Sequence, residues 1–259
     1  MERLGKVEKK IYSLREDHPL VIPQIDPDKL PVEVISKIFQ AISDLGIQHI
    51  ALGGSIITPQ KLQIVQDMAV KDYNFSTVTY PTNSAVCFLN GHEGKTAIYW
   101  MSVLNSENPF FLRDVLVMNS VAVTPNTLEP IPTAYVFDDR GSMRTANWLA
   151  RAVPIPREKP EISLSVALAA QYLGMRIYIM AGGSGSELGP PATHVELLAR
   201  KTNLFIIPTS GILTPEDADL MFKHKADAIH VGKLIEEPKG IETLKKMVSL
   251  ANKYPGKIF

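Results

Sequence analysis

Short apolar, β-branched runs alternate with amphipathic segments along this chain of 259 residues. The runs have the length and composition of buried strands, and the amphipathic segments have helical spacing. The eight expected strands are Leu20–Ile25, His49–Leu52, Phe75–Tyr80, Thr96–Val103, Ala134–Phe137, Met175–Met180, Leu204–Ile207 and Ala228–Val231. The expected helices are Pro31–Leu45, Pro59–Lys71, Asn108–Val121, Ile162–Leu173, Thr193–Lys201, Pro215–Lys223 and Ile241–Lys253. This alternation predicts a parallel sheet covered by helices. Eight strands favour a single α/β domain over residues 1–259, a (β/α)8 TIM barrel, with an open doubly wound sheet as the alternative.

Three segments depart from the regular alternation. The third strand is followed by Pro81–Ser84 and then by Asn90-Gly91, so the third helix is expected to be short, displaced or missing. Met1–Arg15 has the pattern of an extra N-terminal helix, which we expect to cover the bottom of the barrel. Asp138–Lys159 is expected to be irregular, and loops of that length are usually functional or flexible.

Composition excludes several classes of protein. The chain carries 27 Lys and Arg against 27 Asp and Glu, so no basic surface points to a nucleic-acid partner. Its one cysteine, Cys87, excludes an internal disulfide and a cysteine-based zinc site. The first residues, Met1–Asp17, are charged throughout and do not resemble a signal peptide, and no apolar run approaches the ~20 residues of a membrane span. We therefore expect a soluble cytoplasmic protein.

Two carboxylates and a lysine follow the first expected strand, in the segment Asp26-Pro27-Asp28-Lys29. Pro27 cannot continue a strand ladder, so the acidic pair stands where the strand ends. A carboxylate in that position of an α/β protein is placed to hold a divalent cation or to move a proton. The alternative is that Asp28 caps the next helix while Asp26 faces solvent.

Glycine-rich loops follow four of the expected strands. They are Gly53-Gly54-Ser55, Gly182-Gly183-Ser184-Gly185, Ser210-Gly211 and Gly232-Lys233. In a barrel these loops share the face that carries the ligand site, and successive backbone N–H groups bind anions. The pattern predicts a phosphate-bearing ligand. A Mg²⁺ ion held by Asp26 and by phosphate oxygens fits the same face, with Ser55 adding a hydroxyl to the metal or the phosphate.

Strand six and the histidines offer further side chains for the site. Tyr178 and Met180 lie two residues apart in the sixth strand, so they face the same side of the sheet, where simple packing in the barrel is the alternative to a functional role. Four histidines share no metal-ligand spacing and are expected at the surface or in the core. They are His92, His194, His224 and His230.

Three strings in the chain resemble one enzyme family. They are Leu104-Asn105-Ser106-Glu107-Asn108-Pro109, Glu129-Pro130-Ile131-Pro132-Thr133-Ala134-Tyr135 and Ala169-Ala170-Gln171-Tyr172-Leu173-Gly174-Met175. Together with the Asp26 segment and Gly53-Gly54-Ser55, they resemble the geranylgeranylglyceryl phosphate synthases, a family that includes the bacterial heptaprenylglyceryl phosphate synthases. The resemblance extends from Ile25 to about Glu237.

The resemblance implies a TIM-barrel prenyltransferase that alkylates glycerol 1-phosphate with geranylgeranyl diphosphate, forming the first ether bond of archaeal lipids. It implies Mg²⁺ at Asp26 and Ser55, with the prenyl diphosphate bound by Asp26, Gly54 and Ser55. The residues it implies for the glyceryl phosphate are Tyr178, Gly182, Gly183, Ser184, Gly185, Ser210, Gly211, Gly232 and Lys233. Family members are often dimers or hexamers, so the resemblance implies a homo-oligomer, and a lipid product implies peripheral contact with a membrane.

The chain departs from the family pattern at four places. Gln24 replaces a lysine, Met180 replaces the glutamate that orients or deprotonates the acceptor hydroxyl, Thr209-Ser210-Gly211 replaces a triple glycine, and Lys233 replaces threonine or asparagine. Loss of a positioned base lowers a rate by about 10² to 10⁴. Three hypotheses follow: a divergent synthase, a prenyltransferase for a different and more anionic acceptor such as a phosphoglycerate, and a non-catalytic relative that binds phosphate or prenyl ligands.

Overall fold

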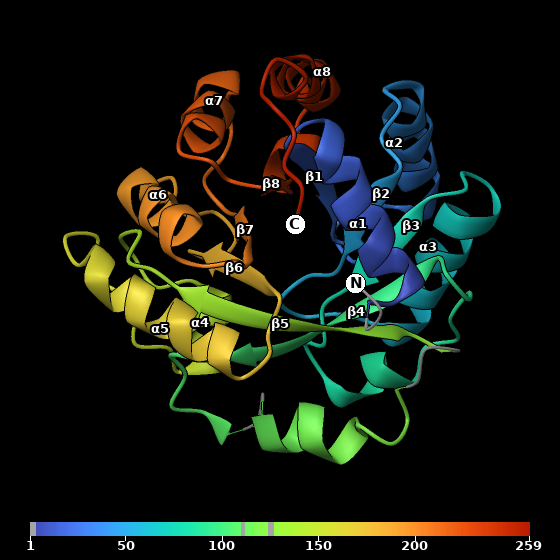
Figure 1. Cartoon of the computed structure of the whole chain (residues 1–259). Coiled ribbons are helices and arrows are strands. Elements are labelled where there is room, and N and C mark those ends of the chain that lie inside the picture. The colour runs from blue at the N-terminus through green and yellow to red at the C-terminus, as the bar shows by residue number, and fades with distance from the viewer. Residues whose placement is uncertain (1–3, 110–111, 124–126) are drawn as a thin grey trace.

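The computed structural model describes residues 4–109, 112–123 and 127–259 and contains a closed barrel of eight parallel strands (Figure 1). The strands are β1 (Leu20–Ile25), β2 (His49–Leu52), β3 (Ser76–Thr79), β4 (Thr96–Val103), β5 (Glu129–Phe137), β6 (Ile177–Ala181), β7 (Phe205–Pro208) and β8 (Ala228–Val231). Strands β1 to β7 pair in sequence order, and β8 pairs with β1. A bridge between Thr209 and His230 joins the ends of β7 and β8. The predicted TIM barrel is confirmed.

Helices surround the barrel. The α-helices are α1 (Lys6–Asp17), α2 (Val32–Asp44), α3 (Pro59–Lys71), α4 (Thr145–Ala150), α5 (Pro160–Tyr172), α6 (Ala192–Lys201), α7 (Pro215–Lys223) and α8 (Gly240–Ala251). The shorter elements are the 3₁₀-helices η1 (Ser84–Phe88) and η4 (Lys233–Glu236) and the π-helix η3 (Leu112–Val117). In the described part of the chain, no helix has the length and apolar character needed to span a membrane.

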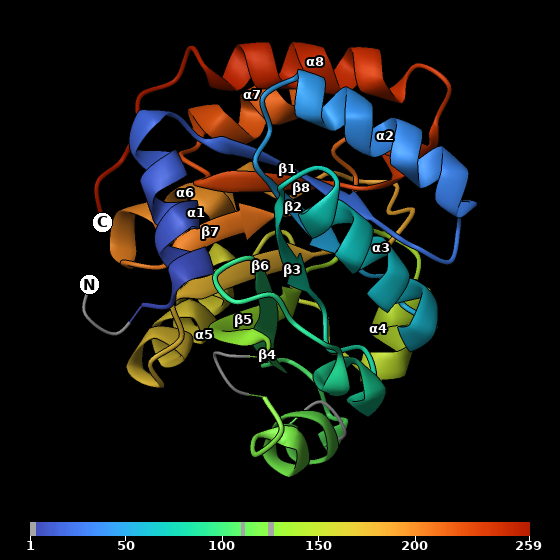
Figure 2. The ribbon, with the colours of Figure 1, turned by 90° about the vertical axis from the view of Figure 1, so that its right-hand side faces the viewer.

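The extra N-terminal helix closes the bottom of the barrel, as expected. The Glu129 carboxylate, at the start of β5, accepts hydrogen bonds from the backbone N–H groups of Val7 (2.8 Å) and Glu8 (2.9 Å). Glu8 also pairs with Arg176, which precedes β6, at 2.6 Å. Because these contacts lie at the amino ends of the strands, α1 leaves the carboxyl ends open. Figure 2 shows α1 at one end of the barrel and α4 toward the other.

Several element boundaries differ from the sequence prediction. The short third helix is confirmed, because η1 is one 3₁₀ segment. Strand β5 starts five residues earlier than predicted, since Pro130 and Pro132 interrupt the apolar run in the sequence but not the pairing with β4. The segment 138–159, predicted to be irregular, contains α4. Of the helix predicted over 108–121, η3 is a π-helix, and residues 110–111 lie outside the described residues.

Most buried apolar side chains of the strands belong to two layers. One fills the barrel interior and includes Ile177 and Ile179 of β6. The other lies between the strands and the surrounding helices and includes Tyr178 and Met180. The strict alternation along β6 therefore places Tyr178 and Met180 on the same side, as predicted, but that side faces the helices.

Candidate active site

A cavity of about 560 Å³ opens at the carboxyl ends of the strands. Ten of the thirteen residues that the resemblance assigns to the site or to the replaced glutamate line it, from the loops after β1, β2, β6, β7 and β8. They are Asp26, Gly54, Ser55, Gly183, Ser184, Gly185, Ser210, Gly211, Gly232 and Lys233. The expectation that the glycine-rich loops share one face is confirmed, and the carboxylate after β1 lies on that same face.

Asp26 stands directly against the loop after β2. The Asp28 backbone N–H donates to its Oδ1 atom (3.1 Å), which orients the carboxylate. A Cβ atom on Gly54 would collide with the Asp26 carboxylate, so glycine is the residue that leaves space for it. Partial burial raises the pKa of Asp26, and the Asp28 hydrogen bond and the nearby Lys29 ammonium oppose that rise. Among the residues that the structure describes, Asp26 forms no ion pair, and a half-buried carboxylate of this kind is suited to bind a cation.

The alternative in which Asp28 caps the next helix is wrong. Helix α2 begins after Pro31 without a side-chain cap, whereas Asp28 Oδ2 accepts from the Thr58 backbone N–H (2.6 Å) at the start of α3. Pro31 occupies the N-cap position of α2, three residues beyond Asp28. Lys29 reaches across the cavity mouth, where its Nζ contacts Glu236 (3.1 Å) and Ser184 Oγ (3.5 Å).

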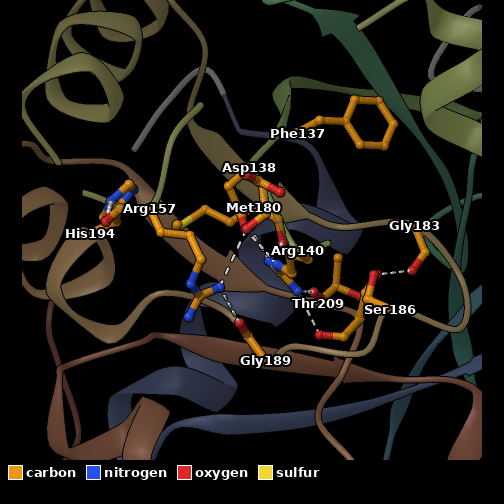
Figure 3. Close-up of polar contacts among 12 residues, drawn as sticks. Phe137, Asp138, Arg140, Arg157, Met180, Gly183, Ser186, Gly189, His194 and Thr209 are labelled. Atoms are coloured by element: carbon orange, nitrogen blue, oxygen red, sulfur yellow. Dashed lines mark hydrogen bonds and ion pairs between the residues drawn. The ribbon is translucent and has the colours of Figure 1, made fainter. Parts of the chain in front are cut away.

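A buried ion pair, which the sequence analysis did not single out, holds the loops after β6 and β7. Arg140 and Asp138 are each 1% exposed and form a two-pronged pair, with Nε–Oδ1 and Nη2–Oδ2 distances of 2.5 and 2.8 Å. The same guanidinium donates to the carbonyl oxygens of Met180 (3.2 Å), Thr209 and Ser210 (2.6 Å). Figure 3 shows Arg140 beside Asp138, Met180 and Thr209. Opposite charges two residues apart after a strand are the sequence signal that could have found this pair.

The loop after β7 has an unusual backbone that the Arg140 contacts support. Ser210 and Gly211 both have left-handed φ angles, +66° and +68°. This conformation is unfavourable for serine, and a Cβ atom on Gly211 would approach the Leu188 carbonyl oxygen to 2.5 Å. Strain of this kind persists where the surroundings fix it, and it gathers at binding sites.

Tyr178, Met180 and Gly182 are the predicted site residues that do not line the cavity. Tyr178 and Met180 are buried in the layer beneath the helices, and Figure 3 shows the Met180 side chain on the side of Arg157 and His194. Within the described ranges the Tyr178 hydroxyl has no hydrogen-bond partner, and burial raises its pKa. Gly182 instead leaves space for the Arg140 side chain.

The rest of the cavity has an apolar wall and a polar floor. The wall is formed by Ile56, Met101, Val103, Phe137, Leu149 and Ala150. The floor includes Tyr80 and His230, whose side chains are hydrogen bonded to each other at 2.6 Å. His230 was expected at the surface or in the core. The sequence carries no signal for its place under the cavity, since the pairing joins residues 150 positions apart.

The residues around Asp26 fit a cation that is held by one protein carboxylate and by the phosphate oxygens of a ligand. Among residues 4–109, 112–123 and 127–259, no three His, Cys, Asp or Glu side chains converge in a metal cluster. Mg²⁺ commonly takes one or two carboxylates and completes its octahedron with water and phosphate oxygens. Asp26 offers one carboxylate beside the Ser55 loop, which fits that mode of binding.

Fold and site together define a TIM-barrel protein whose glycine-rich loops line a cavity at the carboxyl ends of the strands. The chain belongs to the PcrB family, whose model matches residues 12–250.

Three proteins similar to this chain are geranylgeranylglyceryl phosphate synthases by name. Geranylgeranylglyceryl phosphate synthase of Pyrococcus horikoshii is 34% identical over 250 residues, or 94% of each chain. The protein of that name from Pyrococcus furiosus is 34% identical over 249 residues, covering 94% of this chain and 95% of the relative. The crystal structure of (S)-3-O-geranylgeranylglyceryl phosphate synthase from Thermoplasma acidophilum, in complex with substrate sn-glycerol-1-phosphate, superposes with a TM-score of 0.86 at 26% identity, covering 96% of this chain and 99% of the other.

Proposed function

We propose that this protein is a Mg²⁺-dependent prenyltransferase that transfers the geranylgeranyl group of geranylgeranyl diphosphate to glycerol 1-phosphate in ether-lipid synthesis. The observation that carries the proposal is the convergence of the Asp26 carboxylate, an apolar wall and three phosphate-suited loops in one cavity. The relatives named geranylgeranylglyceryl phosphate synthase support the same reaction.

The donor side of the site is formed by the loops after β1 and β2. Asp26 and Ser55 would hold Mg²⁺, which neutralises charge on the departing diphosphate. Gly54 lets the backbone of its loop approach the carboxylate closely. The apolar wall would bury the prenyl chain, and such burial contributes about 25 cal/mol per Å² of apolar surface.

The acceptor side is formed by the loops after β6, β7 and β8. Their backbone N–H groups and the Lys233 ammonium would bind the phosphate. The acceptor hydroxyl then attacks C1 of the prenyl group, a C–O bond forms as the bond to diphosphate breaks, and the hydroxyl proton leaves. Because Met180 faces the helix layer, we assign the proton to a phosphate oxygen of the substrates.

The test is release of diphosphate and formation of the ether product when purified protein is incubated with geranylgeranyl diphosphate, glycerol 1-phosphate and Mg²⁺. The expected result is product with Mg²⁺ and none with a chelator. The Asp26→Asn variant should lose activity, while Glu242→Gln, on the exposed surface of α8, should retain it. Absence of product with every glyceryl phosphate would leave a non-catalytic binding protein.

A different acceptor is the second candidate function. Lys233 lines the cavity beside Gly232, so an additional cation stands next to the proposed phosphate site. A phosphoglycerate, with one more negative charge, would gain from it. Comparing glycerol 1-phosphate with phosphoglycerates as acceptors decides between the two, and Lys233→Thr should lower the preference for the more anionic acceptor.

A further inference from the structure

Three aromatic side chains from different strands meet through hydrogen bonds beneath the cavity. The Tyr80 hydroxyl lies 2.6 Å from His230 Nδ1, and the Tyr99 hydroxyl lies 3.1 Å from His230 Nε2. The exposed fractions of Tyr80, Tyr99 and His230 are 5%, 0% and 1%. Tyr80 and His230 line the cavity, and Tyr99 does not.

The histidine in this group is neutral at physiological pH. Burial lowers the pKa of His230 to about 3. A neutral imidazole carries one N–H donor and one bare nitrogen acceptor. His230 therefore donates to one of the two tyrosines and accepts from the other, and its tautomer decides which hydroxyl proton remains available.

The surroundings of Tyr99 select the tautomer. Across the described residues, His230 is the one hydrogen-bond partner of the Tyr99 hydroxyl. If Nε2 carried the proton, it would donate to Tyr99, and the hydroxyl proton of this fully buried tyrosine would have no acceptor. An unsatisfied buried donor costs about 1–3 kcal/mol. The favoured state has Tyr99 donating to Nε2 and the Nδ1–H group donating to Tyr80, which leaves the Tyr80 O–H free for the cavity.

We propose that the Tyr80 hydroxyl is a substrate contact that donates a hydrogen bond to the non-reacting hydroxyl of the glyceryl phosphate acceptor, with His230 as its positioning residue. The inference rests on the proposed function and adds a determinant of acceptor specificity to it.

The place of Tyr80 in the cavity favours a contact with the non-reacting hydroxyl of the acceptor. Tyr80 comes from the end of β3 but reaches His230, which precedes the proposed phosphate loop at Gly232 by two residues. Two strand residues span roughly 7 Å, a distance that a three-carbon chain can bridge. The reacting hydroxyl must face the diphosphate near Asp26 at the cavity mouth, so the other hydroxyl is left for the floor.

Binding measurements with two acceptors test the contact directly. Calorimetry would compare the binding of glycerol 1-phosphate with that of 3-hydroxypropyl phosphate, in wild type and in Tyr80→Phe. The second ligand lacks the secondary hydroxyl, which is the non-reacting hydroxyl of the proposal. Wild type should bind glycerol 1-phosphate about tenfold more tightly, and Tyr80→Phe should reduce the ratio to near one by weakening that ligand alone. Tyr254→Phe, which removes a hydroxyl bonded to Asp219 between α7 and α8, should keep the wild-type ratio.

Measurements on His230 test its positioning role. Nitrogen NMR should show a protonated Nδ1 and a bare Nε2. His230→Asn offers an N–H in place of the Nδ1–H and should retain part of the binding ratio, whereas His230→Leu should lose it. A protonated Nε2, or equal binding of the two acceptors by wild type, would overturn the inference.

The inference and the proposed function fail in different ways. Transfer to glycerol 1-phosphate with no dependence on the secondary hydroxyl would sustain the function and overturn the role of Tyr80. Hydroxyl-dependent binding without transfer would sustain the role of Tyr80 and refute the prenyltransferase. If neither phosphate bound at all, both would be wrong.

Discussion

Removing the Arg140 guanidinium should damage both the stability of the barrel and its acceptor loops. The Arg140→Ala variant leaves the Asp138 carboxylate buried without a partner. It also deprives the carbonyl oxygens of Met180, Thr209 and Ser210 of a donor. The loss of stability and the loss of acceptor binding can be measured separately. The unpaired carboxylate lowers the stability of the fold, whereas the lost carbonyl contacts also release the loop after β7.

The magnitude follows from the burial of the pair. Breaking a buried ion pair by removing one partner costs about 3–5 kcal/mol. A chain of this size loses about 2–4 °C of melting temperature per kcal/mol, so Arg140→Ala should melt about 10 °C below wild type. Arg140→Lys should recover little of this, because one ammonium cannot span a carboxylate and three carbonyl groups.

Urea denaturation and calorimetry measure the two effects. Replacing both charges, in Asp138→Leu with Arg140→Met, should recover much of the stability, because no buried charge remains. The double variant should still bind glycerol 1-phosphate at least about tenfold more weakly, since the loop has lost its donor. As a control, Arg113→Ala removes an exposed pair with Asp114 and should change neither quantity. A loss of under about 1 kcal/mol in Arg140→Ala would refute the reasoning.

Three further predictions concern the donor side and the position of Met180. Gly54→Ala should displace the Asp26 carboxylate and weaken Mg²⁺-dependent binding of diphosphate about tenfold or more. The control is Gly189→Ala, where the added Cβ atom makes only ordinary contacts and binding should not change. Calorimetry with diphosphate and Mg²⁺ measures the binding of both variants. Burial raises the pKa of Asp26 in the folded state, so ionisation destabilises the fold as pH rises through that pKa. Without Mg²⁺, Asp26→Asn should therefore melt above wild type at pH 8, and the difference should shrink below the raised pKa and vanish below the ordinary pKa of an aspartate. A difference that does not change with pH would contradict this. Met180→Glu places a carboxylate in the buried layer beneath the helices and should lower the free energy of unfolding by about 3 kcal/mol. Met180→Leu should lower it by under about 1.5 kcal/mol. A gain of transferase activity in Met180→Glu would contradict this, because it would show that the side chain at position 180 reaches the acceptor.

The sequence was sufficient for the barrel and for the ring of loops. Strand length, β-branching and the spacing of amphipathic segments predict eight βα units, and the glycine loops then fall on one face by topology alone. Asp26 was found because a proline and an acidic pair directly follow a short apolar run. These signals are local, so they survive without knowledge of distant contacts.

The parts that were missed depend on contacts between distant strands. Alternation fixes Tyr178 and Met180 on one side of β6, but which side faces the interior depends on how the whole sheet closes. The floor pair of Tyr80 and His230 joins β3 with β8 and leaves no pattern in either strand. The alternative in which Asp28 caps α2 is wrong because its carboxylate accepts a hydrogen bond at the start of α3 instead.

The most direct measurement of the central claim is a crystal structure with glycerol 1-phosphate, diphosphate and Mg²⁺ bound. One cavity should hold both ligands, with the cation at Asp26, the diphosphate against the Gly54 loop and the acceptor phosphate at Gly183–Gly185, Ser210-Gly211 and Gly232-Lys233. The acceptor should lie over Tyr80. Ligands bound outside this cavity, or a phosphate beside Tyr178 in the helix layer, would contradict the account.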